Sequence, residues 1–230
     1  MDPSMSRFAP LAGVVFVVLY VIANIVGMSD SPDFAGTPQE ITEYYTDKKD
    51  EILIGGFIGV ISVPFFIWFA GALRSAIARV EGGTTRLAST AFGASIAAVA
   101  AGVAGLMVTA MGALRFDEQD AISPEVATVY YDIGQILGFA AVPALLAAGL
   151  FATALASLRY KAILPAWLAY LTIVLGIIDV IPPISWLGTL LGILWVLVVS
   201  ILLYRQGATA EPTATGAAAA PAVGGVPPAA

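Results

Sequence analysis

The chain alternates between long apolar stretches and short polar segments. Six of these stretches are long enough to cross a bilayer, because a helix needs about 20 apolar residues to span hydrocarbon roughly 30 Å thick. The stretches are continuous and rich in Ala, Leu and Gly, whereas the strands of outer-membrane barrels alternate over about ten residues. The pattern therefore predicts an all-α membrane bundle of six transmembrane helices, at residues 9–28, 52–73, 88–114, 133–158, 162–181 and 183–204.

Two polar segments carry signals for short outer helices before spans two and four. Thr37-Pro38-Gln39-Glu40 supplies a capping threonine, a proline at the first helical position and a capping-box glutamate. Ser123-Pro124-Glu125 begins in the same way. Apolar residues then recur at helical spacing, which predicts amphipathic helices on the bundle rim or the membrane surface. The two apolar faces hold Ile41, Tyr44 and Tyr45, and Val126, Val129, Tyr130 and Ile133.

These two segments share further features. Each has a Tyr-Tyr pair, and a Gly-Phe pair and then a proline follow in the next span. The features suit a duplicated hairpin, with spans one and two repeated as spans three and four. Convergence is the favoured interpretation, because Ser/Thr-Pro-Glu is a common helix start. The two prolines, Pro64 and Pro143, each remove a backbone hydrogen bond and can kink the helix. In a bilayer the freed carbonyl then needs another partner.

Span three has a small residue at every fourth position. Such small-xxx-small patterns let another helix approach closely in a membrane. The partner helix can belong to the same subunit or to a second copy. We call this set the span-three stripe: Ser89, Gly93, Ala97, Ala101, Gly105, Thr109 and Ala113.

Composition agrees with a membrane location. The chain is 59% hydrophobic and 11% charged, whereas soluble domains carry about 25% charged residues. We expect one membrane domain over residues 1–206. The remainder, 207–230, is rich in Ala, Pro and Gly and nearly uncharged, so we expect it to be disordered.

Charged residues predict the orientation. Cytoplasmic loops carry an excess of Lys and Arg. With both termini in the cytoplasm, seven bases lie inside and three lie outside, and 13 of the 16 acids lie outside. We therefore expect both termini to be cytoplasmic. The outer bases are Lys48, Lys49 and Arg115, and the inner ones are Arg7, Arg74, Arg79, Arg86, Arg159, Lys161 and Arg205.

Several chemistries are excluded by composition. The chain has no cysteine and no histidine, which rules out thiol nucleophiles, histidine bases, His/Cys zinc sites and haem ligated by these residues. It holds no phosphate-binding glycine loop or dinucleotide fingerprint, and we expect no cofactor. The net charge of −6 disfavours nucleic acid as a partner. These features favour a protein that is not an enzyme.

Few residues remain as functional candidates. Asp179 is the only ionisable residue within a predicted span, and it lies three residues before Pro182, which predicts a place at the outer headgroup level. There it can contact a cation or a substrate with Gln135 or Arg115. Asp117 and Asp120 belong to an acid-rich outer segment that lacks the pattern of a calcium loop. Other polar side chains in the spans suit hydrogen bonds between helices: Asn24, Ser95, Thr109, Thr153, Thr172, Thr189 and Ser200.

The order of these segments resembles a group of small proteins. The residues that carry the likeness are Leu19-Tyr20-Val21-Ile22-Ala23-Asn24, the Thr37 helix start with Tyr44-Tyr45, and Ser123-Pro124-Glu125. Over about residues 8–204 the chain is similar to six-helix integral membrane proteins of actinobacteria that carry a domain of unknown function. The resemblance implies a multi-pass bacterial plasma-membrane protein with no assigned activity, and it carries over no site residue.

Three functions remain open. The leading hypothesis is a membrane protein that acts by contact with lipid, with a second copy or with another membrane protein. The alternative is a small-solute transporter or channel, with a cavity between the kinks at Pro64 and Pro143. A weaker alternative is an intramembrane enzyme that uses carboxylates at the outer face.

Overall fold

The structure, a computed structural model, describes residues 8–33, 36–83, 85–119 and 123–209, and this part of the chain holds helices and turns but no strand. The all-α class is therefore confirmed. The helices are η1 (Ala9–Leu11), α2 (Ala12–Gly27), α3 (Pro38–Asp47), α4 (Lys49–Glu81), α5 (Arg86–Gln119), α6 (Pro124–Ile136), the π-helical turn η2 (Leu137–Ala141), α7 (Val142–Tyr160), α8 (Ala166–Val180), η3 (Pro182–Ile184) and α9 (Ser185–Thr209).

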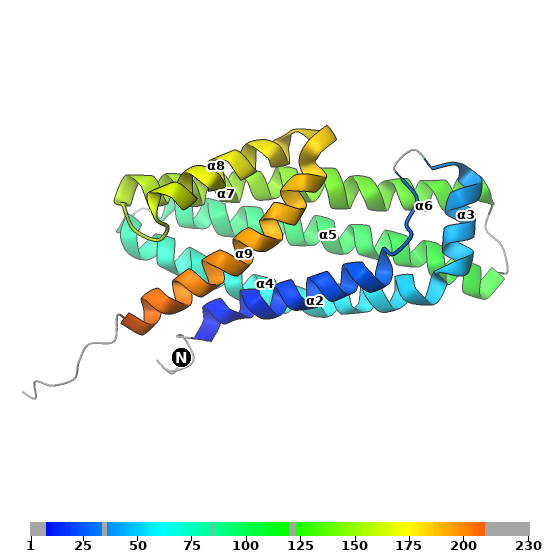
Figure 1. Ribbon diagram of the computed structural model, residues 1–230, viewed down its shortest axis with the longest axis horizontal. Coiled ribbons are helices and arrows are strands. Elements are labelled where there is room, and N and C mark those ends of the chain that lie inside the picture. Colours follow the sequence, from blue (N-terminus) through cyan, green and yellow to red (C-terminus); the bar gives the residue numbers. More distant parts are fainter. Residues whose placement is uncertain (1–7, 34–35, 84, 120–122, 210–230) are drawn as a thin grey trace, which may run out of the picture.

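The long helices lie roughly along one axis (Figure 1). Each packs against the next in chain order, and α9 returns to pack against α2. The short helix α3 crosses one end of the bundle. The start of η1 and the end of α9 both lie at the opposite end. We call the two ends the α3 end and the terminal end.

Five of the described helical segments are long and apolar enough to cross a membrane: Ala9–Gly27, Lys49–Glu81, Arg86–Arg115, Pro124–Tyr160 and Ser185–Gln206. The fifth predicted span, residues 162–181, corresponds to α8, which has only 15 residues. At 1.5 Å per residue it is about 22 Å long, which is shorter than a typical hydrocarbon core. The short length reflects prolines at both ends, because Pro165 precedes α8 and Pro182 follows it.

Large apolar side chains cover the outside of the bundle. Ile25 and Phe57 are each 68% exposed, and Tyr170 and Trp167 are each 61% exposed. A soluble monomer rarely exposes apolar patches larger than a few hundred Å². An outer surface of this kind is typical of helices that face lipid.

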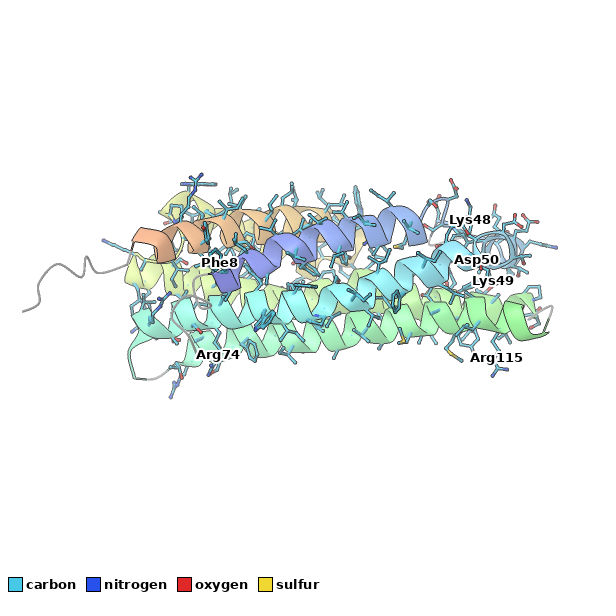
Figure 2. All side chains as sticks on the ribbon, turned by 90° about the horizontal axis from the view of Figure 1, so that it is seen from below. Phe8, Lys48, Lys49, Asp50, Arg74 and Arg115 are labelled. Carbon is cyan, nitrogen blue, oxygen red and sulfur yellow. The ribbon has the colours of Figure 1, made fainter. Side chains whose placement is uncertain are left out.

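Charged side chains collect at the two ends. Figure 2 shows Arg74 and Phe8 at the terminal end, and Lys48, Lys49, Asp50 and Arg115 at the α3 end. Arg74, which is predicted to lie inside the cell, is therefore at the opposite end of the bundle from the three bases predicted to lie outside. Lys48 also forms an ion pair with Asp30, N to O 3.1 Å, which raises the pKa of the lysine.

The buried side chains form two clusters. The larger cluster lies toward the terminal end and includes Phe69, Ile77, Ala156 and Val199. The smaller one lies at the α3 end, where Ile41, Tyr44 and Tyr45 pack with Ala127 and Tyr131. The apolar face predicted for the first outer helix is thus buried at the bundle rim.

Helix α3 has the predicted start. The Glu40 N–H donates to Thr37 Oγ1 at 3.3 Å, and the Thr37 N–H donates to Glu40 Oε2 at 2.7 Å, which completes a capping box. The second of these bonds lowers the pKa of Glu40. Burial raises the pKa of Tyr44 on the inner face of α3, so that phenol stays neutral and donates to the Gly27 carbonyl at 2.8 Å.

The second predicted outer helix is not separate from span four. It begins at Pro124 as expected, but α6 continues through η2 into α7 without a break. The apolar face predicted for it is largely exposed, with Val129 55% and Ile133 43% accessible. The buried face consists instead of Ala127, Tyr131 and Gly134, small residues and one tyrosine that the amphipathic pattern did not single out.

Helices α2 and α4 approach each other closely enough to bring their backbones into contact. A Cβ added at Gly27 would lie 3.0 Å from the Gly55 Cα, and one added at Gly55 would collide with the Gly27 backbone. The contact is between backbones, so neither helix can yield without moving. This pair is not predictable from the sequence, because Gly27 and Gly55 belong to different spans and no local pattern connects them.

The span-three stripe faces two directions. Gly105 and Ala113 are buried, and a Cβ at Gly105 would lie 3.1 Å from Leu137 and 3.2 Å from the Gly134 carbonyl oxygen. Gly93 and Ala97 are exposed. A helix turns about 100° per residue, so each step of four residues moves the stripe about 40° around the axis. Only its second half therefore packs within this chain.

The Gly27–Gly55 approach generates a stability prediction. We expect Gly55→Ala to destabilise the protein by about 1–3 kcal/mol, because the added methyl overpacks a backbone contact. The measurement is thermal unfolding of the detergent-solubilised protein. Gly71→Ala is the matched control, since a Cβ there meets no atom within 4 Å. The control should unfold at the same temperature or higher, and equal behaviour of the two variants would contradict the packing.

Candidate functional site

A cavity of about 260 Å³ lies among the helices. Residues from α2, α4, α5, α6, α7 and α9 line it, and α8 contributes Asp179. Helices α2 and α9 are close at the terminal end, where a Cβ at Gly13 would collide with Ser200, and they diverge toward α3 (Figure 1). The cavity has both of these helices in its wall and is largely apolar.

Glycines keep part of this space open. Gly56, Gly138 and Gly192 line the cavity, and a Cβ added at any of them would meet no atom within 4 Å. These glycines differ from Gly55, where the missing side chain is needed for helix contact. Part of the cavity is therefore open because glycine stands at these three positions, where any larger residue would place a side chain in the space.

Asp179 is the one charged residue among the described residues that line the cavity. It belongs to the last turn of α8 and is only 4% exposed. None of the described residues forms a hydrogen bond with its buried Oδ1 atom. Gly188 of α9 packs directly on the carboxylate, because a Cβ at this position would overlap Oδ1.

The carboxylate lies deeper in the bundle than the hairpin turn alone suggested. The turn between α8 and α9 ends well short of the α3 end of the bundle (Figure 1). Asp179 therefore faces α9 and the cavity, and it is not an exposed group at a loop. The sequence identified the residue but not its burial, because burial depends on where the short α8 ends relative to its longer neighbours.

The other candidate residues are placed differently. Gln135 lines the same cavity, but its Nε2 donates to the Tyr131 hydroxyl at 2.7 Å, and that hydroxyl donates to the Pro32 carbonyl. Arg115 is exposed at the α3 end and does not line the cavity. Asp120 and the side chain of Asp117 lie outside the described residues.

The two prolines have unequal roles. Pro143 is fully buried and lines the cavity, whereas Pro64 is exposed on α4, which runs on through it as a helix. A cavity between the two prolines was expected, and of the two only Pro143 lines the cavity. Just before Pro143, the Val142 N–H reaches back five residues to the Leu137 carbonyl, which gives the π-helical turn η2.

Ser185 satisfies the carbonyl that Pro143 leaves free. Proline has no N–H, so the carbonyl of Phe139, four residues earlier, loses its α-helical donor. The Ser185 hydroxyl donates to that carbonyl oxygen at 2.5 Å, and the Pro182 carbonyl oxygen, 2.9 Å away, is its alternative acceptor. Ser185 begins α9, so this bond ties the α8–α9 hairpin to the π-helical turn. It supplies the partner that the kink was predicted to need, and sequence reasoning could not say which residue it is.

Most other polar side chains in the bundle do not connect helices, contrary to expectation. Their donors bond carbonyls three or four residues earlier in the same helix, as serine and threonine often do. The bond from Trp195 Nε1 to Thr172 Oγ1, 2.8 Å, does cross from α9 to α8. The donors that bond within their own helices include Asn24, Ser62, Ser95, Thr153, Thr189 and Ser200.

A second hollow of about 510 Å³ lies at the α3 end and is lined mainly by acids, including Asp30, Asp33 and Glu40. Among the described residues, no group of three or more acids is arranged to hold a metal ion. The described residues of this hollow therefore lack the geometry of a metal site. The cavity with Asp179 is the better candidate.

No protein-family model, curated protein or solved structure matches the chain.

The bond between Ser185 and Phe139 is open to test. We expect Ser185→Ala to lower the free energy of unfolding by roughly 1–3 kcal/mol, because it removes the hydroxyl that donates to the half-buried Phe139 carbonyl. Thermal unfolding in detergent measures the loss. Ser75→Ala is the control, since that exposed hydroxyl bonds only the Gly71 carbonyl of its own helix. In a Pro143→Ala background, where alanine supplies an N–H, Ser185→Ala should cost less, and an undiminished cost would contradict this role.

Proposed function

We propose that this protein crosses a bacterial plasma membrane six times and binds a small lipophilic molecule in the cavity between α2 and α9. The single observation that carries the proposal is the glycine-lined, largely apolar cavity with one buried carboxylate. The resemblance in segment order supports the bacterial membrane, and the exposed apolar side chains support the lipid-facing surface.

Contacts of α8 support a sixth crossing. It packs between α7 and α9, and its outer side chains are as exposed as those of the longer helices, with Leu171 53% and Val174 51% accessible. Ile163 and Leu164 add buried apolar residues before its start. A short helix can cross where the bilayer thins around it. The charge distribution along the bundle then favours both termini in the cytoplasm.

Single cysteines test this topology, because the natural chain has none. We expect a membrane-impermeant maleimide to label Thr46→Cys in intact cells, and to label Ser75→Cys and Gln206→Cys only after the membrane is opened. If α8 does not cross, residues 75 and 206 lie on opposite sides. Labelling of Gln206→Cys but not of Ser75→Cys in intact cells would therefore contradict six spans.

Size and lining favour a slender lipophilic ligand. Pockets for small molecules usually measure about 300–1,000 Å³, so this cavity of about 260 Å³ is slightly smaller than that range. Asp179 has no second carboxylate, lysine or arginine beside it among the described lining residues. General acid–base chemistry on a bound molecule usually needs a positioned partner group. The geometry thus suits binding better than catalysis.

Transport of the same molecule is the second candidate. It is favoured by Pro143 and the π-helical turn η2 in the cavity wall, because such turns often occur at functional sites in helices. Flux of the bound molecule into proteoliposomes separates transport from binding. Uptake that depends on the protein supports transport, and binding without uptake supports a binding protein.

Filling the cavity should abolish binding. We expect Gly192→Leu to remove saturable quenching of Trp195 by a brominated long-chain alcohol in phosphatidylcholine nanodiscs. Trp195 lines the cavity, and the other three tryptophans are replaced by phenylalanine so that it alone reports. Gly93→Leu is the matched control, because Gly93 is equally open to a side chain but does not line the cavity. Equal saturable quenching in both variants would contradict the cavity as the site.

A further inference from the structure

Hydrogen-bond donors of the cavity wall are largely committed to the protein itself. Asn24, Ser62, Ser95, Thr153 and Thr189 line the cavity, and each donates to a carbonyl of its own helix. A bound molecule that needs donors would find few in this wall. A molecule that offers a hydrogen-bond donor, in contrast, finds an unused acceptor at Asp179.

Asp179 supplies a hydrogen-bond acceptor to which no described residue donates. Its Oδ1 is buried, and none of the described residues donates to it. A buried carboxylate is costly unless it is paired with an opposite charge and hydrogen bonded. No lysine or arginine is among the described lining residues, and the chain has no histidine. The wall therefore lacks a hydrogen-bond donor for Oδ1, and a positively charged donor would both fill that place and balance the charge of an ionised carboxylate.

We propose that the cavity binds a lipophilic amine, whose protonated nitrogen donates to Asp179 and whose apolar chain lies between α2 and α9. This inference rests on the proposed binding function and names the class of ligand. The ammonium group supplies both the charge and the hydrogen that Oδ1 lacks. The wall of glycines and apolar side chains, with Phe16 and Val196 among them, suits the hydrocarbon part.

Gly188 makes the arrangement possible. Because a Cβ at this position would overlap Oδ1, the absence of a side chain lets the carboxylate reach the cavity beside α9. Gly188 is thus a positioning residue for Asp179. An alanine there would displace the carboxylate without removing it.

Three probes with the same hydrocarbon chain separate the elements of this recognition. Dodecylamine carries charge and N–H donors, dodecyltrimethylammonium carries charge without a donor, and dodecanol carries a hydroxyl without charge. Binding is measured in neutral phosphatidylcholine nanodiscs by competition with the brominated alcohol at Trp195. We expect the wild-type protein to bind dodecylamine at least tenfold more tightly than either of the other two probes.

Variants then assign the preference to one residue. We expect Asp179→Asn to bind dodecanol as the wild type does and to lose the preference for dodecylamine. Asp50→Asn removes an exposed acid at the α3 end, outside the cavity, and should keep the preference. A preference that survives in Asp179→Asn overturns the proposal.

The wild-type comparison decides the matter by itself if Asp179→Asn does not fold. Equal affinity for dodecylamine and dodecanol in the wild type overturns the amine proposal and leaves lipophilic binding standing. If no probe binds saturably, or if Gly192→Leu binds all three as the wild type does, the proposed binding function itself fails. The two failures are thus distinguishable.

Discussion

The structure depends on one constraint, which is that polar groups inside a membrane bundle must find partners within the protein. Serine and threonine hydroxyls meet it by bonding carbonyls of their own helices. Where Pro143 removes a backbone donor, Ser185 crosses from α9 to replace it. Asp179 is the described side chain that departs from this rule, because its Oδ1 is buried without a donor. Burying a carboxylate oxygen without a donor costs folding free energy, which is why we assign this oxygen to ligand recognition.

Glycine has two opposite uses in the bundle. At Gly27 and Gly55 the missing side chains bring α2 and α4 into backbone contact. At Gly56, Gly138 and Gly192 they leave space that no neighbour fills. The first use fixes the helices relative to one another, and the second creates a cavity between helices that cannot collapse together. Rigid close contacts and an open volume thus come from the same residue type at different positions.

Local features of the fold were predictable, whereas features that join distant segments were not. The apolar stretches predicted the long helices, and the capping residues predicted the starts of α3 and α6, because both signals lie within a few neighbouring residues. The sequence could not predict which half of the span-three stripe packs within the chain. A four-residue repeat winds around a helix of 3.6 residues per turn, so the two halves face different directions. Asp179 could be found from its charge. Its burial, its contact with Gly188 and its place in the cavity wall could not be predicted, because they depend on where α8 ends relative to α9.

The central claim is that the cavity holds a lipophilic molecule against Asp179. It is tested most directly by an experimental structure of the protein in phosphatidylcholine nanodiscs with dodecylamine present. We predict elongated density between α2 and α9 that ends within hydrogen-bonding distance of the Asp179 carboxylate. A closed cavity, or an Asp179 carboxylate bonded to a donor of the protein itself, would contradict the account.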